Sequence, residues 1–211
     1  YYGISETPDP AFWTSFTNET LKSALDEYWP NEATEPVESV RQKYGYIGTW
    51  DVSQVIYMWY LFERKYEFNE DISNWNVSNV IDMQSMFQWC RNFNRNLNTW
   101  DVSNVKNMSG LFERAEKFNQ SINDWNVSNV TEMNKIFHWA ESFNQPIGKW
   151  NVSNVKSMKQ LFKRAREFNQ DISEWNVSNV TNMEEMFSNA GKFNQPIGKW
   201  DVSNVKKMTY M

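Results

Sequence analysis

The chain has 211 residues, of which 40% are hydrophobic and 17% aromatic, so it carries enough apolar side chains for a substantial core. Its formal net charge is −5 and no basic stripe is visible, which argues against a nucleic-acid partner. One cysteine and one histidine exclude an internal disulfide framework, a multi-cysteine metal site and a zinc site built from histidines. We therefore expect no cofactor, and the lack of a run of about 18 apolar residues predicts no membrane insertion within this segment.

The N-terminal part, residues 1–46, differs from the rest of the chain and predicts an acidic helical cap. It contains eight acidic and three basic side chains. Residues 18–29 have the apolar spacing of an amphipathic helix with Asn18 as its N-cap. Residues 35–45 predict a second short helix that ends at Gly45. Two such helices would supply the polar outer face that the end of a stacked repeat array needs.

The remainder, residues 47–211, repeats with a period of 25 residues. Tryptophan recurs without insertion at positions 50, 75, 100, 125, 150, 175 and 200. Valine, methionine and phenylalanine recur at the same interval elsewhere in the repeat. So strict a period predicts one structural unit stacked on copies of itself. The last copy stops at Met211, inside a repeat, so we expect the array to continue beyond this residue.

Within one repeat, the spacing of the apolar residues changes midway. Trp75 and Val77 are two residues apart, as on one face of a strand. The apolar residues of 80–90 are then spaced three, four and three apart, which is typical of a helix. We therefore predict an α/β solenoid that is leucine-rich-repeat-like. It would have about seven 25-residue strand–helix rungs with parallel strands, and an N-terminal helical cap.

The segment FNQDISEWNVSNVTNMEEMF, residues 168–187, resembles the BspA-like surface-protein repeats of the leucine-rich-repeat group. Ile172, Trp175 and Val177 match the first three apolar positions of the leucine-rich-repeat motif. Related segments fill residues 47–211, and six or seven copies agree at many positions. The resemblance implies a protein of adhesion or recognition displayed outside the cell, on a cell surface or on a virion surface. It supplies no catalytic residues.

Two polar columns, meaning sets of residues 25 apart, form a candidate binding face that we call the Ser/Asx face. If the neighbouring tryptophan and valine point into the core, these side chains point outward and make a flat polar surface. They are Asp51, Ser53, Asn76, Ser78, Asp101, Ser103, Asn126, Ser128, Asn151, Ser153, Asn176, Ser178, Asp201 and Ser203. One interpretation is that they provide hydrogen-bonded solubility and cap the predicted helices, and the other is that they recognise a protein or a glycan. A stack of calcium ions fits less well, because most of the Asx side chains are neutral asparagines.

Two further columns are expected to be structural. The tryptophans would fill the core, and an asparagine column would form a buried amide ladder that holds the loop backbone. The predicted ladders comprise Trp75, Trp100, Trp125, Trp150, Trp175, Asn94, Asn119, Asn144 and Asn169.

A 50-residue period is superimposed on the 25-residue one. One column alternates arginine and tryptophan, in the order Arg64, Trp89, Arg114, Trp139 and Arg164. Stacking the repeats would interleave guanidinium groups with indole rings, so Arg114 is expected to lie between Trp89 and Trp139.

No histidine, cysteine or paired-acid constellation stands apart from the repeat, so we expect the protein not to be an enzyme. The predicted function is a non-catalytic surface recognition or adhesion module that binds a protein partner through a rigid solenoid. One alternative is a structural building block or spacer that contacts neighbouring subunits in a larger extracellular or viral assembly. Another is glycan binding along the Ser/Asx face.

Overall fold

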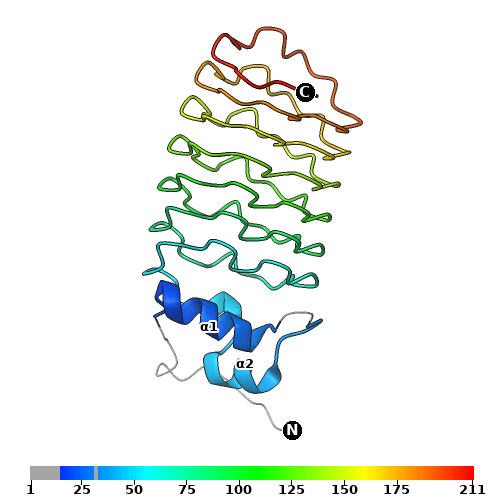
Figure 1. Cartoon of the computed structure of the whole chain (residues 1–211). Helices are drawn as coiled ribbons and strands as arrows, with labels where there is room; N and C mark the ends of the chain where they lie inside the picture. Colours follow the sequence, from blue (N-terminus) through cyan, green and yellow to red (C-terminus); the bar gives the residue numbers. More distant parts are fainter. Residues whose placement is uncertain (1–14, 31–32) are drawn as a thin grey trace.

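The computed structural model describes residues 15–30 and 33–211. Two helices lie at one end, α1 (Asn18–Tyr28) and α2 (Glu38–Tyr44), followed by the 3-10 helix η2 (Ile47–Thr49). The rest of the chain winds into turns that lie one above another and form an elongated stack (Figure 1). We number its repeats 1 to 7 by their tryptophans, Trp50, Trp75, Trp100, Trp125, Trp150, Trp175 and Trp200.

The prediction of an α/β solenoid with strand–helix rungs is wrong. Residues 50–211, all of them described, consist of turns, extended links and isolated parallel bridges, with neither an α-helix nor a strand longer than one residue. Each bridge between two repeats joins a residue to the one 25 positions later, so the repeats stack in register. The bridges connect Tyr57, Asp82, Asn107, Glu132, Ser157, Asn182 and Lys207 in succession.

Backbone hydrogen bonds between repeats take the place of the predicted helix. The N–H groups of Met58, Tyr60 and Phe62 donate to carbonyl oxygens of repeat 2 at 2.8–2.9 Å. Alternate N–H groups therefore point to the next repeat and are not available for helical hydrogen bonds. The N–H groups between them close tight turns, for example from Lys65 to the Phe62 carbonyl at 3.0 Å.

Two left-handed residues, four positions apart in each of repeats 1 to 6, complete this turn structure. The columns that contain Tyr60 and Arg64 have positive φ angles, 53° and 61° in repeat 1, and keep positive values in the later repeats. A right-handed helix cannot pass through such residues. The apolar side chains spaced three, four and three apart nevertheless lie inside the stack, since Val80, Met83, Phe87 and Cys90 are all buried.

The core is a continuous column of aromatic and aliphatic side chains that runs the length of the stack. Phe112 and Phe118 stack within repeat 3 at 3.9 Å, and Phe112 stacks on Phe137 of repeat 4 at 6.0 Å. From repeat 2 onward, the indole Nε1–H of each tryptophan that numbers a repeat donates to a backbone carbonyl of the preceding repeat. In repeat 4, for example, Trp125 donates to the Leu97 carbonyl at 2.9 Å. Each tryptophan thus fills the core and joins two repeats.

Helix α1 covers the N-terminal end of the stack. The ring of Trp50, which has no earlier repeat beneath it, packs against Phe16 at 4.8 Å and Tyr28 at 5.3 Å. Its Nε1–H finds no hydrogen-bond partner among the described residues. Lys65 is buried, and its Nζ donates to Asp26 at 3.1 Å and to the Trp29 carbonyl. This contact anchors the C-terminal end of α1, where the helix dipole favours a cation.

Helices α1 and α2 lie within the segments predicted to be helical, residues 18–29 and 35–45, and α2 ends at Gly45, its C-cap, as predicted. Helix α1 begins after Thr17, whose side chain caps it, so the prediction that Asn18 is the N-cap is wrong. Asn18 instead accepts backbone N–H groups of repeat 1, from Ile56 at 2.8 Å and from Tyr57 at 3.1 Å. Residues 1–14 of the predicted cap lie outside the described part of the chain.

The alternating arginine and tryptophan column stacks as predicted from Trp89 to Arg164, whereas Arg64 at its start does not lie over the Trp89 ring. The Cζ atom of Arg114 lies 4.1 Å from the ring centroid of Trp89 and 4.6 Å from that of Trp139. Arg164 lies 4.2 Å from the Trp139 ring on the other side. The column occupies left-handed turn positions rather than a helix, yet the stacking survives because it depends only on the 25-residue register.

Trp125→Ala tests the tryptophan column. We expect the substitution to lower the free energy of unfolding by about 3–5 kcal/mol, because it opens a cavity and leaves the Leu97 carbonyl without its donor. Trp125→Phe keeps most of the ring and should lose less. Chemical denaturation followed by circular dichroism gives both values. A Trp125→Ala protein as stable as the parent would contradict the role given to this column.

Arg114→Lys tests the stacking of the guanidinium between two indoles. Lysine keeps the charge but lacks the flat group that packs on a ring, so we expect a loss of up to about 1 kcal/mol. Lys106→Arg, at an exposed position of the same repeat, is the matched control and should leave the stability unchanged. Equal stability of the two variants in thermal denaturation would show that the stacking contributes nothing.

Candidate functional site

The Ser/Asx face lies on the outside of the stack. Its Asx side chains are exposed in repeats 2 to 7, and only Asp51 is partly buried. The serines are half-buried in repeats 1 to 6, and Ser203 is exposed. All fourteen side chains occupy equivalent positions, so they form two straight rows along the stack.

Many side chains of the Ser/Asx face form hydrogen bonds with nearby backbone groups of the same chain. In every repeat the Oδ1 atom of the Asx residue accepts the N–H of the serine two residues later, at 3.0 Å for Asp101 with Ser103 and 3.2 Å for Asn126 with Ser128. This is an Asx-turn, which fixes the corner of the repeat. The asparagine after each serine from repeat 2 onward adds a bond between repeats. Asn129 Nδ2, for example, donates to the Ser103 carbonyl at 2.7 Å.

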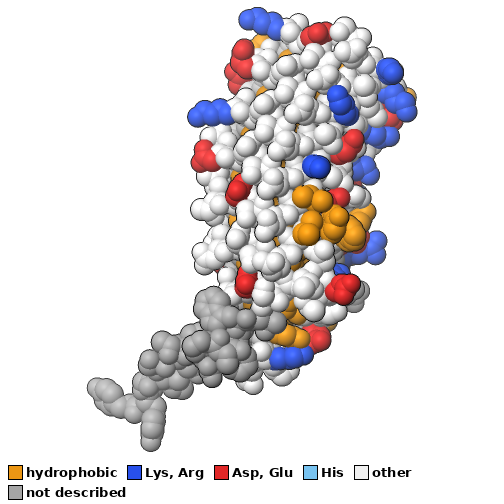
Figure 2. Space-filling model, turned by 90° about the vertical axis from the view of Figure 1, so that its left-hand side faces the viewer, with side chains coloured by type: hydrophobic (Ala, Val, Ile, Leu, Met, Phe, Trp, Pro, Cys, Tyr) orange, Lys and Arg blue, Asp and Glu red, His pale blue; other side chains and the backbone are white. Residues whose placement is uncertain are grey.

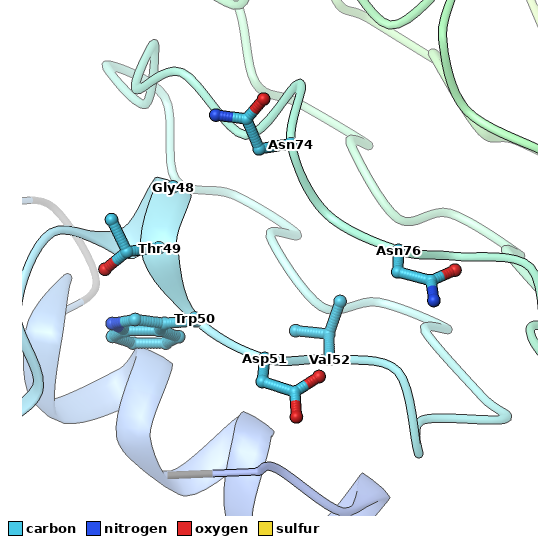
Figure 3. Close-up of a pocket in the computed structure, with 7 residues that line it drawn as sticks. All are labelled: Gly48, Thr49, Trp50, Asp51, Val52, Asn74 and Asn76. Atoms are coloured by element: carbon cyan, nitrogen blue, oxygen red, sulfur yellow. The ribbon is translucent and has the colours of Figure 1, made fainter. Parts of the chain in front are cut away.

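A hollow of about 440 Å³ lies at the N-terminal end of the Ser/Asx face (Figure 3). It brings together Asp51 of repeat 1 and Asn76 of repeat 2, with Asn74 beside them. The other lining residues come from η2 and the start of repeat 1. Gly48 is required in η2, because a Cβ there would lie 2.4 Å from the Asp71 carbonyl oxygen. The hollow presents one carboxylate and two amides, a set suited to hydrogen bonding rather than to catalysis.

The asparagine column forms a ladder of side chain to backbone hydrogen bonds. The Oδ1 atom of Asn94 accepts the N–H of Asn119 at 3.0 Å, and Asn119 accepts that of Asn144 in the same way. Asn144 does the same for Asn169 at 2.9 Å. These side chains are half-buried or exposed, so the expected burial of the ladder is wrong. They hold the loops together at the surface.

A second face was missed from the sequence. We call it the variable face and define it by the columns that start at Tyr57, Trp59, Tyr60 and Glu63 and continue at every 25th residue. Its side chains change from aromatic to amide, acid, base or glycine between repeats, whereas the Ser/Asx face hardly changes. This face could have been found from the sequence, because the residue types at these four columns vary from repeat to repeat although the 25-residue period is strict.

The middle of the variable face contains a polar hollow of about 200 Å³. Gly110 is part of its lining and brings no side chain where the neighbouring repeats have Ser85 and Lys135. Glu113, which is largely buried, lies at the edge of the hollow. It accepts a hydrogen bond from Gln88 at 2.6 Å and lies 2.8 Å from His138 Nδ1.

The network around Glu113 keeps this carboxylate ionised. Burial on its own would raise the pKa of Glu113, but the hydrogen bond from His138 and the charge of Lys135 hold it below its usual value. Both carboxylate oxygens are engaged by neighbours. The cluster therefore fixes the shape and charge of the surface across repeats 2 to 4.

A family model described as "Mycoplasma protein of unknown function, DUF285" matches residues 32–142 and again residues 121–211. The chain belongs to this family. No curated protein and no solved structure gives a significant match. The resemblance of residues 168–187 to BspA-like repeats stays a prediction, since the matching family carries another description. Among the described residues, no helix has the length and apolarity needed to cross a membrane.

Asp101 tests whether the Ser/Asx face stabilises the fold. Hydrogen bonds from the Ser103 hydroxyl and N–H hold the pKa of Asp101 below its usual value. Its ionised form therefore stabilises the protein above the unfolded-chain pKa of about 3.9, and this contribution is lost as the pH falls through the lower folded value. Asp101→Ala should cost about 1 kcal/mol at pH 7.

Asp101→Asn is the matched control, because asparagine occupies the same position in four other repeats and keeps the Oδ1 acceptor. We expect this variant to be close to the parent at pH 7 and to lose less stability on acidification. Melting temperatures between pH 7 and pH 3 give the comparison. An Asp101→Ala protein with the parent's melting temperature would show that this turn bond is dispensable.

Proposed function

We propose that this chain is a non-catalytic recognition module, displayed on a surface, that binds a protein partner through its variable face. The observation that carries the proposal is that residue types are nearly constant along the Ser/Asx face and vary from repeat to repeat along the variable face. The near-constant columns bond to their own backbone in every repeat, as Asp101 does to Ser103. The variable columns do so only in some repeats, as Asp82 does to the N–H of Gln84 at 2.8 Å, and their residue types change while the 25-residue register is kept.

The stacking does not rest mainly on the side chains of the variable face, although some of them also bond between repeats, as Asn134 Oδ1 does when it accepts the N–H of Lys159 at 3.1 Å. Its register is maintained by backbone bonds, such as the one from Gly110 N–H to the Asn134 carbonyl at 2.7 Å. Substitutions at these positions that improve the binding of a partner therefore cost little stability of the fold. Repeat proteins use extended surfaces of this kind for binding, because many weak contacts are presented at fixed spacing.

The charges on the variable face favour a protein partner over a nucleic acid. Acids and bases alternate and pair, as Lys159 with Glu184 at 3.1 Å and Lys163 with Glu185. The side of the molecule in Figure 2 likewise shows charges of both signs scattered among uncharged and hydrophobic groups, without a continuous basic band. A mixed surface with exposed tyrosine and tryptophan is typical of protein interfaces.

Site-specific photo-crosslinking tests which face binds. Benzoylphenylalanine would replace Lys135 on the variable face or, as the control, Asn151 on the Ser/Asx face. Lys135 suits the substitution because Tyr60 shows that its column accepts an aromatic side chain. The experiment uses the full-length protein on the cells or particles that display it, and mass spectrometry identifies the adducts.

We expect an adduct with a different protein from position 135 and none from position 151. An adduct from position 151 alone would assign recognition to the Ser/Asx face instead. Adducts that join two copies of this chain would favour the structural building block. A protein that forms no adduct from either position would contradict the proposal.

A further inference from the structure

An exposed aromatic cluster stands at the N-terminal end of the variable face. Tyr57, Trp59 and Tyr60 are 41%, 52% and 39% exposed. In repeats 2 to 6 the same columns contain polar residues or glycine, so the cluster is not required by the repeat. Large exposed aromatic side chains gathered at one spot mark a surface that binds something.

The cluster is built as a hollow rather than a flat patch. The rings of Tyr57 and Trp59 stack with 5.2 Å between their centroids and 26° between their planes. Together with Tyr60 they line a cavity of about 280 Å³, and Asn18 and Lys22 of α1 line it as well. The cavity thus combines aromatic surfaces with amide, ammonium and carboxylate groups, the last from Glu19 of the same helix.

Hydrogen bonds hold the lining in place. Asn18 is fixed by the backbone of repeat 1, and Lys22 donates to the Leu61 carbonyl at 3.3 Å. The hydroxyl of Tyr60 accepts a hydrogen bond from Gln84 at 2.7 Å. A lining that is already ordered loses little conformational entropy when a ligand binds.

We propose that this cavity binds a neutral saccharide. One side of a sugar ring presents polarised C–H groups, which are attracted to the electron-rich face of an aromatic ring, while its hydroxyl groups require donors and acceptors around the edge. The cavity offers both. With one carboxylate, Glu19, and one ammonium, Lys22, it has no excess charge that would favour a strongly charged ligand.

The position of Tyr60 extends the site beyond a single sugar. Tyr60 lines both the aromatic cavity and the polar hollow at Gly110. An oligosaccharide with one unit on the aromatic rings can therefore continue along the stack toward Glu113. This inference rests on the proposed function in one respect, since it places the saccharide site on the face that we assign to recognition.

A glycan array with neutral, sialylated and sulfated oligosaccharides, probed with the whole chain, tests the proposal. We expect binding to neutral oligosaccharides, and titration of the best of these, followed by tryptophan fluorescence, gives the affinity. Trp59→Ala should weaken this affinity by about tenfold or more, as the loss of a central aromatic contact does. Trp59 is exposed, so its removal should leave the melting temperature unchanged.

Tyr46→Ala removes another exposed aromatic side chain outside the cavity and should leave binding intact. Failure of the array to show any neutral ligand would overturn the proposal, as would binding that Trp59→Ala does not weaken. Preference for sulfated or sialylated glycans would contradict the charge argument. A photo-crosslinked protein partner at position 135 whose binding needs Trp59, without any glycan, would replace the saccharide by protein and leave the proposed function in place.

Discussion

The backbone hydrogen bonds that run from each repeat to the next are the interaction on which this molecule depends. They use alternate N–H groups, such as those of Met58 and Tyr60, and fix the register at 25 residues. Every column of side chains exists because this register does not slip. The tryptophan bonds, the stacked phenylalanines and the arginine–tryptophan contacts are all consequences of placing like positions above one another.

The sequence was sufficient to predict the features that depend on period alone. The buried tryptophans and the position of Arg114 between two indoles followed from counting residues. The backbone conformation did not follow, because a spacing of three, four and three is compatible with a helix and also with a series of turns. What decides between them is whether alternate N–H groups bond within the repeat or to the next one, and that depends on contacts far apart in the chain.

The candidate site shows the same limit. Outward-facing Asx and serine side chains could be predicted from their place beside core residues, but a sequence does not reveal that Asp101 Oδ1 is engaged by Ser103. The aromatic cluster around Trp59 appears in the sequence only as three departures from the polar residues found at the same columns in repeats 2 to 6. Its hollow depends on α1, which folds back onto repeat 1 from outside the repeat array.

The alternation of Arg114 with Trp89 and Trp139 constrains how such a chain could change its copy number. Removing or duplicating a single 25-residue unit in the middle would place two arginines, or two tryptophans, in adjacent layers. Adjacent guanidinium groups repel each other, whereas an even number of units preserves the alternation. A change of length in steps of fifty residues keeps these contacts, so a pair of repeats is the smallest unit that can be added here without disturbing the stacking, although the unit of structure is one.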